Sequence, residues 1–421
     1  MRYILSFVLA LLVCDSAFSK KTGITETKTP LILLSIDGFA FDYLTTYQPK
    51  NILDFEKAGT SAKLLPIYPS KTFPNHLSII TGVYPEKHGI IHNTFYHPYL
   101  NKDYYKGAGK NNSAWVTATP FWSIAEDNNI TSAVYFWPES EMKNQSTPPR
   151  YNIPYNNQDT DKARFDQIIN WLKLPDDKAP QFIVSYFSSV DSAGHKFGPN
   201  SAEVAKAVKN IDNLFGNFIK RIQKEIPHKA NIILVSDHGM VQVDTKKSIT
   251  HSMIFSEKIS TLIDEKVIMV AQSDTQLYLY FKTNTLTEHQ QKSIFQELVT
   301  KQKYNTHLYR VYEKYHYPKH WQFNNNLVIT PDVIIEAKPP AIFSNKQKVY
   351  SSLGTHGYDA LNQTVLASIF IASGPNINEG RVVQPFENIH LVPFMSQLLG
   401  IKQQENIDGK KAVLTPLIKF N

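Results

Sequence analysis

The sequence predicts an α/β protein with a central, mostly parallel sheet, helices on both faces and a smaller inserted subdomain. Short runs of β-branched and aromatic residues alternate with amphipathic segments, which is typical of this fold class. One stretch, from about 250 to 345, has strand and helix signals of its own. No fixed-period repeat or long low-complexity linker divides the 421 residues, so the pattern gives no firm domain boundary.

Strands are predicted where short apolar runs stand between polar segments. They are LILLSI at 31–36, TSAVYF at 131–136, FIVSYF at 182–187, NIILVS at 231–236 and LASIFI at 366–371. Between them, 161–173 and 201–224 have the apolar spacing of amphipathic helices. In the 250–345 stretch, TQLYLYF indicates a strand and EHQQKSIFQELVTKQ a helix, but composition does not indicate what this insert does.

The first 19 residues have the pattern of a secretory signal peptide. Arg2 precedes an apolar run from Tyr3 to Val13, and the small residues Ala17 and Ser19 precede a plausible cleavage point. The run is short for a membrane span, and no later segment has the roughly 20 apolar residues that a membrane helix needs. We therefore expect an exported, soluble mature protein that is periplasmic or secreted.

Cysteine usage supports the same compartment. Cys14 is the only cysteine, so cleavage after Ser19 leaves a mature chain without disulfides, thiolate chemistry or cysteine zinc ligands. The periplasm is favoured because a large secreted eukaryotic protein more often carries disulfides. A lipid anchor at Cys14 is a weaker alternative, since Val13 is larger than the residue that such processing usually prefers.

The net charge of +7 comes mainly from scattered lysines. This pattern is typical of a solvated basic surface rather than a nucleic-acid groove, so we expect no stable nucleic-acid complex. The excess charge would favour an anionic small-molecule substrate at a distance. The sequence gives no indication of the oligomeric state.

Acidic residues follow three of the predicted strands. Asp37, Asp191 and Asp237 stand just after the strands, with His195 four residues after Asp191 and His238 directly after Asp237. Ligands of open α/β sheets collect outside the carboxyl ends of the strands, so we expect these side chains to share one crevice. A single acid of this kind could be a loop cap or turn former. Three together, with nearby histidines, favour a binding site.

A further histidine, His356, lies in GTHGYD between glycines that let the backbone pass close to another group. Alone it could be a surface histidine in a glycine-rich turn. Together with the three aspartates and two other histidines, it completes an oxygen and nitrogen ligand set suited to two zinc ions.

The segment YPSKTFPNH, residues 68–76, places Thr72 close to a predicted helix start. Proline is well tolerated in the first helical turn, so Pro74 predicts a helix start with Thr72 just outside it. An isolated threonine at such a position is usually an N-cap. Its hydroxyl would also lie in the positive field of the helix N-terminus.

Five ordered motifs resemble those of the nucleotide pyrophosphatase/phosphodiesterase family within the alkaline phosphatase superfamily. They are SIDGFAFDYL, PSKTFPNHLSIITGVYPEKHGIIHN, VDSAGHKFGP, SDHGM and THGYD. The resemblance spans about 29–410 and implies an alkaline phosphatase-like fold in one bacterial-type catalytic domain, 28–415, with the insert at about 250–345. It does not include the Cys-rich or nuclease-like modules of some animal members.

The resemblance also implies a role for each matching residue. One zinc ion is assigned to Asp191, His195 and His356, and the other to Asp37, Thr72, Asp237 and His238. Thr72 is then the nucleophile of a double displacement with a covalent phospho-threonine, which water hydrolyses. Asn93 and backbone N–H groups near Thr72 would neutralise phosphate charge. Phe73 and Tyr155 would bind the nucleobase.

The expected reaction is cleavage of nucleotide phosphodiester or pyrophosphate bonds, with release of nucleoside monophosphates. A sulfatase needs Cys or Ser followed by x-Pro-x-Arg, which TFPNH lacks. Phe73 after the nucleophile, and the absence of an arginine near the motifs, favour a diester over a monoester dianion. The first alternative is a choline phosphodiester or lysophospholipid substrate. Phosphonate hydrolysis, or a secreted binding protein without activity, comes after it.

Overall fold

The computed structural model describes residues 29–419, except 144, 146, 227–228, 324–327, 345–351 and 403. The predicted signal peptide at 1–19, including Cys14, lies outside the described residues. Within the described residues, no helix is long and apolar enough to cross a membrane.

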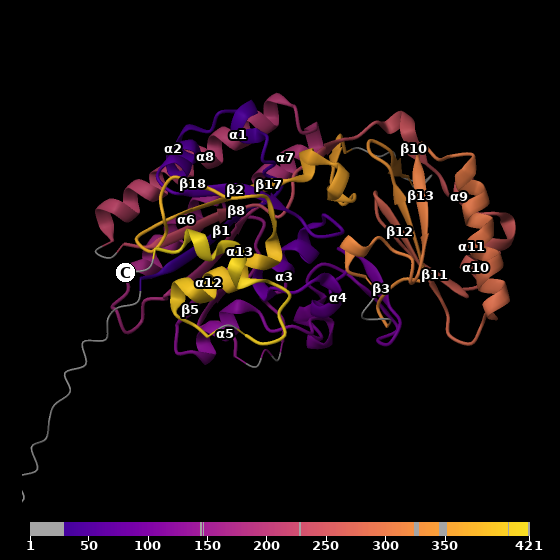
Figure 1. Ribbon diagram of the computed structural model, residues 1–421, viewed down its shortest axis with the longest axis horizontal. Helices are drawn as coiled ribbons and strands as arrows, with labels where there is room; N and C mark the ends of the chain where they lie inside the picture. Colours follow the sequence, from indigo (N-terminus) through magenta and orange to yellow (C-terminus); the bar gives the residue numbers. More distant parts are fainter. Residues whose placement is uncertain are drawn as a thin grey trace, which may run out of the picture.

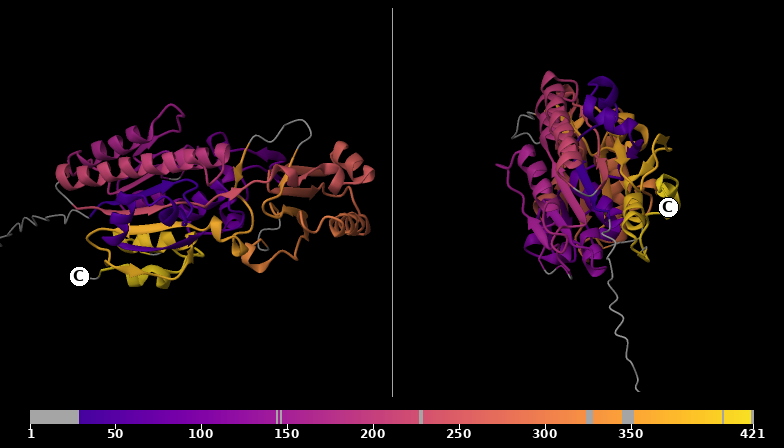
Figure 2. Two further views of the ribbon diagram at one scale, coloured as in Figure 1. Left: turned by 90° about the horizontal axis from the view of Figure 1, so that it is seen from above. Right: turned by 90° about the vertical axis from the view of Figure 1, so that its left-hand side faces the viewer.

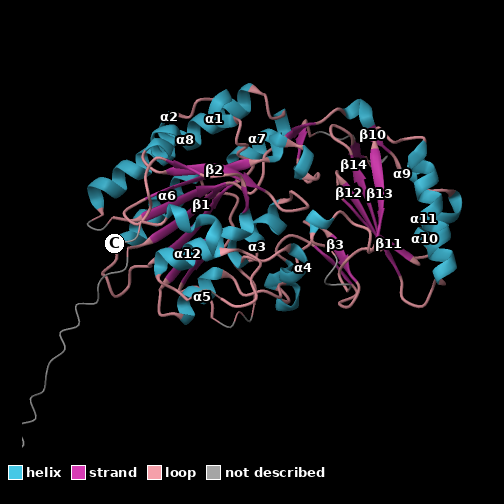
Figure 3. Ribbon diagram, viewed as in Figure 1, coloured by secondary structure: helices cyan, strands magenta, loops and turns pink. Residues whose placement is uncertain are grey.

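A nine-stranded sheet forms the centre of the protein (Figures 1 and 3), in the order β18-β2-β17-β8-β1-β7-β5-β6, with β19 also paired to β2. Its strands are β1 (Leu31–Ile36), β2 (Thr60–Leu65), β5 (Ser132–Tyr135), β6 (Tyr151–Ile153), β7 (Phe182–Phe187), β8 (Asn231–Val235), β17 (Ser368–Ser373), β18 (Arg381–Val382) and β19 (Phe386–Glu387). Only β17 runs antiparallel to its neighbours, β2 and β8. The prediction of a mostly parallel sheet is confirmed.

All five predicted strands are present in this sheet. The bounds of β1 and β7 are as predicted, whereas β17 begins and ends two residues later than expected. Residues 364–366 form a 3-10 turn, so the apolar run joins the sheet only at Ser368. Element boundaries of this kind are set by pairing partners rather than by apolarity.

The alternating side chains of β1 show why helices cover both faces of the sheet. Leu31 and Leu33 lie in one core, whereas Ile32 and Leu34 lie in the other, because successive residues of a strand face opposite sides. The first core packs against α3 (Thr72–Thr81), α5 (Phe121–Asp127) and α12 (Leu391–Leu399), and the second against α2 (Lys50–Lys57), α6 (Asp161–Leu172) and α8 (Ala202–Glu225). Figure 2 shows the long α8 and the yellow α12 on opposite sides of the sheet.

Sequence patterning explains both long helices of the second core. The side chain of Ser201 caps α8, and that of Thr160 caps α6, each by accepting a hydrogen bond from a backbone N–H three residues later. The buried face of α8 repeats every three or four residues and comprises Val204, Val208, Ile211, Phe215, Phe218 and Ile222. The predicted helices at 161–173 and 201–224 are therefore present.

A separate antiparallel sheet, in the order β11-β12-β14-β13, lies beside the central one (Figure 1). It comprises β11 (Ile268–Gln272), β12 (Gln276–Phe281), β13 (Tyr309–Glu313) and β14 (Val333–Ala337), accompanied by α9 (His251–Ile254), α10 (Glu257–Asp264) and α11 (Glu288–Lys303). TQLYLYF and EHQQKSIFQELVTKQ thus form β12 and α11. This insert has its own core, and a further core that includes the stacked pair Tyr68 and Trp321 joins it to the part built on the central sheet.

Shorter elements complete the described chain around these two sheets. They are α1 (Tyr43–Thr46), α4 (Pro85–His88), α7 (Ser189–Phe197), α13 (Lys411–Leu414), β3 (Phe95–His97), β4 (Lys102–Tyr104), β9 (Val241–Gln242), β10 (Ser248–Ile249), β15 (Ile342–Phe343) and β16 (Gly354–Thr355).

Candidate active site

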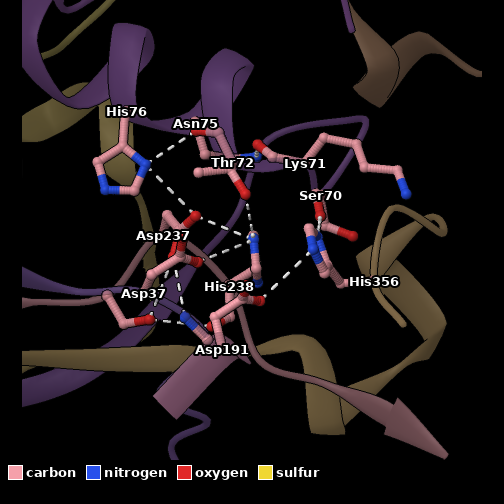
Figure 4. A network of polar contacts seen from close by, with 12 residues as sticks. Asp37, Ser70, Lys71, Thr72, Asn75, His76, Asp191, Asp237, His238 and His356 are labelled. Carbon is pink, nitrogen blue, oxygen red and sulfur yellow. Dashed lines mark hydrogen bonds and ion pairs between the residues drawn. The ribbon is translucent and has the colours of Figure 1, made fainter. Parts of the chain in front are cut away.

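The sheet order brings the three predicted aspartates together. Strands β8, β1 and β7 are adjacent and parallel, so their carboxyl ends lie at one edge. Asp37 follows β1, Asp237 follows β8 by one intervening residue, and Asp191 lies in the first turn of α7 after β7. Figure 4 shows the three carboxylates and two histidines, His238 and His356, gathered around one small space.

One group of ligand atoms surrounds His238. Its Nε2 atom lies 2.9 Å from Asp237 Oδ2 and 3.5 Å from Asp37 Oδ1. The hydroxyl oxygen of Thr72 lies 3.3 Å from the same nitrogen. All four residues are buried, and the ligand atoms of the two aspartates and His238 lie within 4.8 Å of one another.

A second group surrounds Asp191. The Nε2 atoms of His195 and His356 lie 3.4 and 3.6 Å from Asp191 Oδ1, and 3.1 Å from each other. The ring of His356 stacks on that of His238 with centroids 3.5 Å apart, so the two groups are contiguous. His238 therefore also lies within 4.8 Å of the Asp191 and His356 ligand atoms. The structure thus brings together all seven residues predicted as metal ligands.

Backbone carbonyls fix the orientation of the three histidines. A carbonyl can only accept a hydrogen bond, so each Nδ1 within reach of one carries the proton, and Nε2 keeps its lone pair in the neutral ring. The Nδ1–carbonyl pairs are His195 with Gly354 at 2.9 Å, His238 with Gly239 at 2.9 Å, and His356 with Ser70 at 2.8 Å. Histidines that bind metals are held in the same way.

The electrostatics of the site fit a bound cation. Burial raises the pKa of Asp37 well above its ordinary value, and the nearby charges of Asp191 and Asp237 raise it further. Within the described residues, Asp37 Oδ1 and Asp191 Oδ1 are buried and receive no hydrogen bond. Burial, together with His238, Lys71 and His195, lowers the pKa of His356 and keeps its ring neutral. Divalent metal ions would offset the clustered carboxylate charge and occupy the unused oxygen and nitrogen lone pairs.

Thr72 lies in a different position from the predicted one. Helix α3 begins at Thr72, so the threonine is the first helical residue rather than a residue just outside the helix. The N-cap position belongs to Lys71, whose backbone is extended and whose side chain makes no capping hydrogen bond. The hydroxyl of Thr72 is directed toward His238 instead (Figure 4).

The start of α3 offers fewer free backbone donors than expected. Phe73 donates its N–H to Asn93 Oδ1 at 2.9 Å, and Pro74 has none. Of the backbone N–H groups near Thr72 that are expected to neutralise phosphate charge, that of Phe73 is therefore already paired and Pro74 contributes none. The same hydrogen bond orients the Asn93 amide so that its NH₂ group is the end that remains to donate.

Two residues predicted to bind substrate line a cavity of about 390 Å³. Phe73 and Tyr155 line it together with Thr72, Asp191 and His195. Phe73 is largely buried, whereas 46% of Tyr155 is exposed and its ring packs 4.6 Å from that of Phe136. The cavity therefore has a polar side formed by the candidate ligands and an aromatic side.

Two buried residues of the site escaped sequence-based prediction. The hydroxyl of Tyr186 donates to Asp37 Oδ2, and His76 Nδ1 lies 3.3 Å from Asp237 Oδ2. Tyr186 belongs to an apolar strand and gives no signal of its own. His76 stands four residues after Thr72, a helical spacing that could have pointed to the same face.

Comparisons with known proteins agree with this geometry. The family model described as type I phosphodiesterase / nucleotide pyrophosphatase matches residues 31–359. An uncharacterized pyrophosphatase/phosphodiesterase of Schizosaccharomyces pombe is 31% identical, covering 94% of this chain and 81% of that protein. Venom phosphodiesterase of Naja atra is 33% identical over 96% of this chain and 48% of its own length. Ectonucleotide pyrophosphatase/phosphodiesterase family member 3 of Rattus norvegicus is 32% identical over 93% of this chain and 44% of its own.

Solved structures give the same fold. Murine and human ectonucleotide pyrophosphatase/phosphodiesterase 5 match with a TM-score of 0.81 at 23% and 24% identity, covering 93% of this chain and 100% of theirs. One murine structure is an inactive threonine-to-alanine variant in complex with AMP. The alkaline phosphatase-like fold is confirmed. The chain spans about half the length of the venom and rat relatives.

The carboxylate cluster predicts opposite effects of Asp37→Asn with and without metal. The pKa of Asp37 is higher in the folded protein than the ordinary value of 3.8, which applies to the unfolded chain. The free energy of unfolding of the metal-free protein therefore falls as the pH rises from 3.8 through the folded-state pKa. We therefore expect Asp37→Asn to raise the Tm in chelator at neutral pH, with a gain that shrinks as the pH falls toward 3.8, and to lower the Tm in zinc. Thermal unfolding under both conditions measures this. Equal destabilisation with and without zinc would contradict the cation site.

Proposed function

Since the chain belongs to the type I phosphodiesterase / nucleotide pyrophosphatase family, we propose that it is a two-zinc hydrolase of nucleotide phosphodiester or pyrophosphate bonds that releases nucleoside monophosphates. The observation that carries this proposal is the position of the Thr72 hydroxyl, 3.3 Å from His238 Nε2 at the start of α3. The complex of the murine relative with AMP supports a nucleotide substrate.

The zinc ions would be held by the two contiguous ligand groups. Asp191, His195 and His356 would hold one ion, and Asp37, Thr72, Asp237 and His238 the other. Aspartate oxygens and neutral imidazole nitrogens are ordinary zinc ligands. When bound, the ions supply positive charge that lowers the pKa of a coordinated hydroxyl and offsets charge developing on phosphate oxygens.

The reaction would proceed in two steps, with Thr72 as the nucleophile and Asn93 as a hydrogen-bond donor. The Thr72 oxygen attacks phosphorus, forming a phospho-threonine diester as the bond from phosphorus to the leaving oxygen breaks. Water attacks the same phosphorus in the second step, and the bond to Thr72 breaks. The Asn93 amide, held by the Phe73 N–H, donates to a non-bridging oxygen throughout.

The aromatic side of the cavity would receive the nucleobase. Its volume of about 390 Å³ suits a small organic ligand, and Phe73 lies next to the nucleophile in sequence. Tyr155 offers a second ring on the same cavity. No arginine belongs to the described residues that line it, which suits a singly charged diester better than a dianion.

We further propose that the protein is exported as a single catalytic domain, 28–415, with the insert at about 250–345. The signal-like pattern at 1–19 supports export to the periplasm or beyond the cell, and the relatives are named as venom and ectonucleotide enzymes.

Metal analysis tests the zinc assignment. We expect two zinc ions per chain by elemental analysis, loss of turnover in chelator, and recovery on adding zinc. His356→Ala removes a ligand of one ion and should bring the zinc content toward one per chain. His251→Ala, an exposed histidine outside the site, serves as the control and should keep both ions. A fully active protein without metal would end this proposal.

Substitution of Thr72 separates a nucleophile from a structural residue. We expect Thr72→Ala to reduce turnover by at least about 10³-fold, whereas folding and zinc content change far less because six ligands remain. Thr72→Ser keeps the hydroxyl and should retain partial activity. A quenched reaction of the wild type with labelled diester, followed by peptide mapping, should place the label on Thr72. Near-normal turnover of the alanine variant would exclude the double displacement.

Substitution of Phe73 tests the nucleotide assignment. Stacking of a base on an aromatic ring contributes about 1–3 kcal/mol, so Phe73→Ala should raise KM for a nucleotide diester by about tenfold. A small phenyl diester should be affected much less. Tyr155→Ala, at a more exposed position, gives the same comparison with less disturbance of the core. Equal losses for both substrates would mean that Phe73 is a packing residue and would remove the main support for a nucleotide substrate, whereas faster turnover of a choline phenyl diester would favour the choline phosphodiester alternative.

A further inference from the structure

The turn between β11 and β12 projects from the insert into the catalytic part of the molecule. We call residues 273–276, which are this turn and the first residue of β12, the insert turn. Its side chains contact residues that directly precede or follow Thr72, Asn93 and His356, as described below, although the three site residues are far apart in sequence. None of the residues of this turn lines the substrate cavity. The turn is therefore placed to affect the site only through its neighbours.

The first contact is an ion pair with the residue before the nucleophile. Lys71 Nζ lies 2.7 Å from Asp274 Oδ1, with only 6% of the lysine side chain and 17% of the aspartate side chain exposed. Lys71 occupies the N-cap position of α3, directly before Thr72. The ion pair therefore restrains the backbone at the start of this helix. Figure 4 shows the lysine side chain extending away from the Thr72 hydroxyl.

The second set of contacts holds the segment around His356 from both sides. Asp274 Oδ2 accepts a hydrogen bond from the hydroxyl of Thr355, and Gln276 Nε2 donates to the carbonyl of Gly357 at 2.6 Å. His356 lies between these two anchors. One carboxylate thus joins the segment before Thr72 to the segment before His356.

Gly357 allows this close packing. Its φ of +122° is a conformation that side chains rarely adopt, and a Cβ there would lie 2.3 Å from Lys71 Cε and 2.5 Å from Thr275 Oγ1. The His356 segment is therefore in direct van der Waals contact with both the lysine and the insert turn.

The third contact reaches the residue before Asn93. His92 Nδ1 accepts a hydrogen bond from the N–H of Thr94, and Nε2 lies 3.2 Å from Gln276 Oε1. Burial and the charge of Lys71 lower the pKa of His92 to about 3, so the ring is neutral. Its single proton is then on Nε2 and is donated to Gln276. The amide of Gln276 therefore links the Asn93 segment to Gly357.

We propose that Asp274 and Gln276 of the insert turn are positioning residues that hold Thr72, Asn93 and His356 in their mutual arrangement. The insert then acts as a part of the active site without touching the substrate. This inference rests on the proposed function for its catalytic consequences, but its effect on the metal site can be measured independently of turnover.

The test uses the full-length protein and three measurements on each variant: Tm, kcat and KM, and the rate of zinc release to a chelator. We expect Asp274→Ala and Gln276→Met to lower kcat by about tenfold to a hundredfold with little change in KM, because displacements near 1 Å cost about that much. Zinc retention should weaken by about tenfold or more, as for other residues that orient metal ligands. Lys71→Arg keeps the charge and should recover most of the activity lost in Lys71→Met.

Two variants within the insert serve as matched controls. Asp332→Ala removes the ion pair with Lys314 at 3.3 Å and the hydrogen bond from Phe281 N–H at 2.7 Å, and Gln302→Met removes the hydrogen bond from Val311 N–H at 2.6 Å. Both weaken the insert away from the insert turn. We expect them to lower the Tm comparably and to leave kcat and zinc release unchanged. If Asp274→Ala does not fold, the milder Asp274→Asn and the variant Lys71→Met give the same comparison.

A double variant adds a test of coupling. If Lys71 and Asp274 act as one unit, Lys71→Met combined with Asp274→Ala should lose no more activity than either change alone. Additive losses, or variants that match the controls in kcat and zinc release, would overturn the positioning role. The two proposals can fail separately. If the wild type cleaves no diester, the proposed function is refuted. If the insert-turn variants nevertheless release zinc faster than the controls, the positioning role still holds.

Discussion

The mutual repulsion of three clustered carboxylates, two of them buried and the third partly buried, is the constraint around which the site is built. Asp37, Asp191 and Asp237 stand at the ends of adjacent parallel strands, and burial makes their joint ionisation costly without positive charge. Among the described residues, the ion-pair partners of these carboxylates are histidines, and none is a lysine or arginine. The three histidines instead direct their Nδ1 protons toward backbone carbonyls. The lone pairs of their Nε2 atoms therefore remain available to bind a cation. The fold tolerates this local cost because the large cores on both faces of the sheet hold the strands in place.

Thr72, the proposed nucleophile, lies beside the same group of carboxylates and histidines. Helix α3 packs in the first of the two cores and places Thr72 beside His238, while the N–H of Phe73 is paired with Asn93 and Pro74 has none. In the proposed mechanism, Asn93 and the metal ions would therefore neutralise most of the charge of a bound phosphate. The aromatic side of the cavity would then bind the part of the substrate that does not react, as proposed above.

Much of the candidate site could be predicted from the sequence, because the functional residues of parallel sheets tend to follow the carboxyl ends of the strands. Asp37, Asp237 and His238 come directly after apolar runs, and adjacent parallel strands bring such positions together. Tyr186 could not be predicted, since a tyrosine inside a strand looks like any core aromatic. The roles of Asp274 and Gln276 were equally invisible, because their contacts depend on how two separate sheets dock. The position of Thr72 within α3 was missed by one residue, since Lys71 rather than Thr72 turns the chain into the helix.

The contacts of the insert turn also bear on the order in which the molecule folds. The turn contacts segments on both sides of itself in the chain, because it joins the segments that contain Thr72 and Asn93 to the later segment that contains His356. Closing loops of this length is slow and entropically costly, so such contacts form late. The ligand groups should therefore reach their final spacing only at the end of folding. Tight metal binding would then report that folding is complete. A nascent or truncated chain that lacks His356, the last of the proposed ligands in the sequence, would bind metal only weakly.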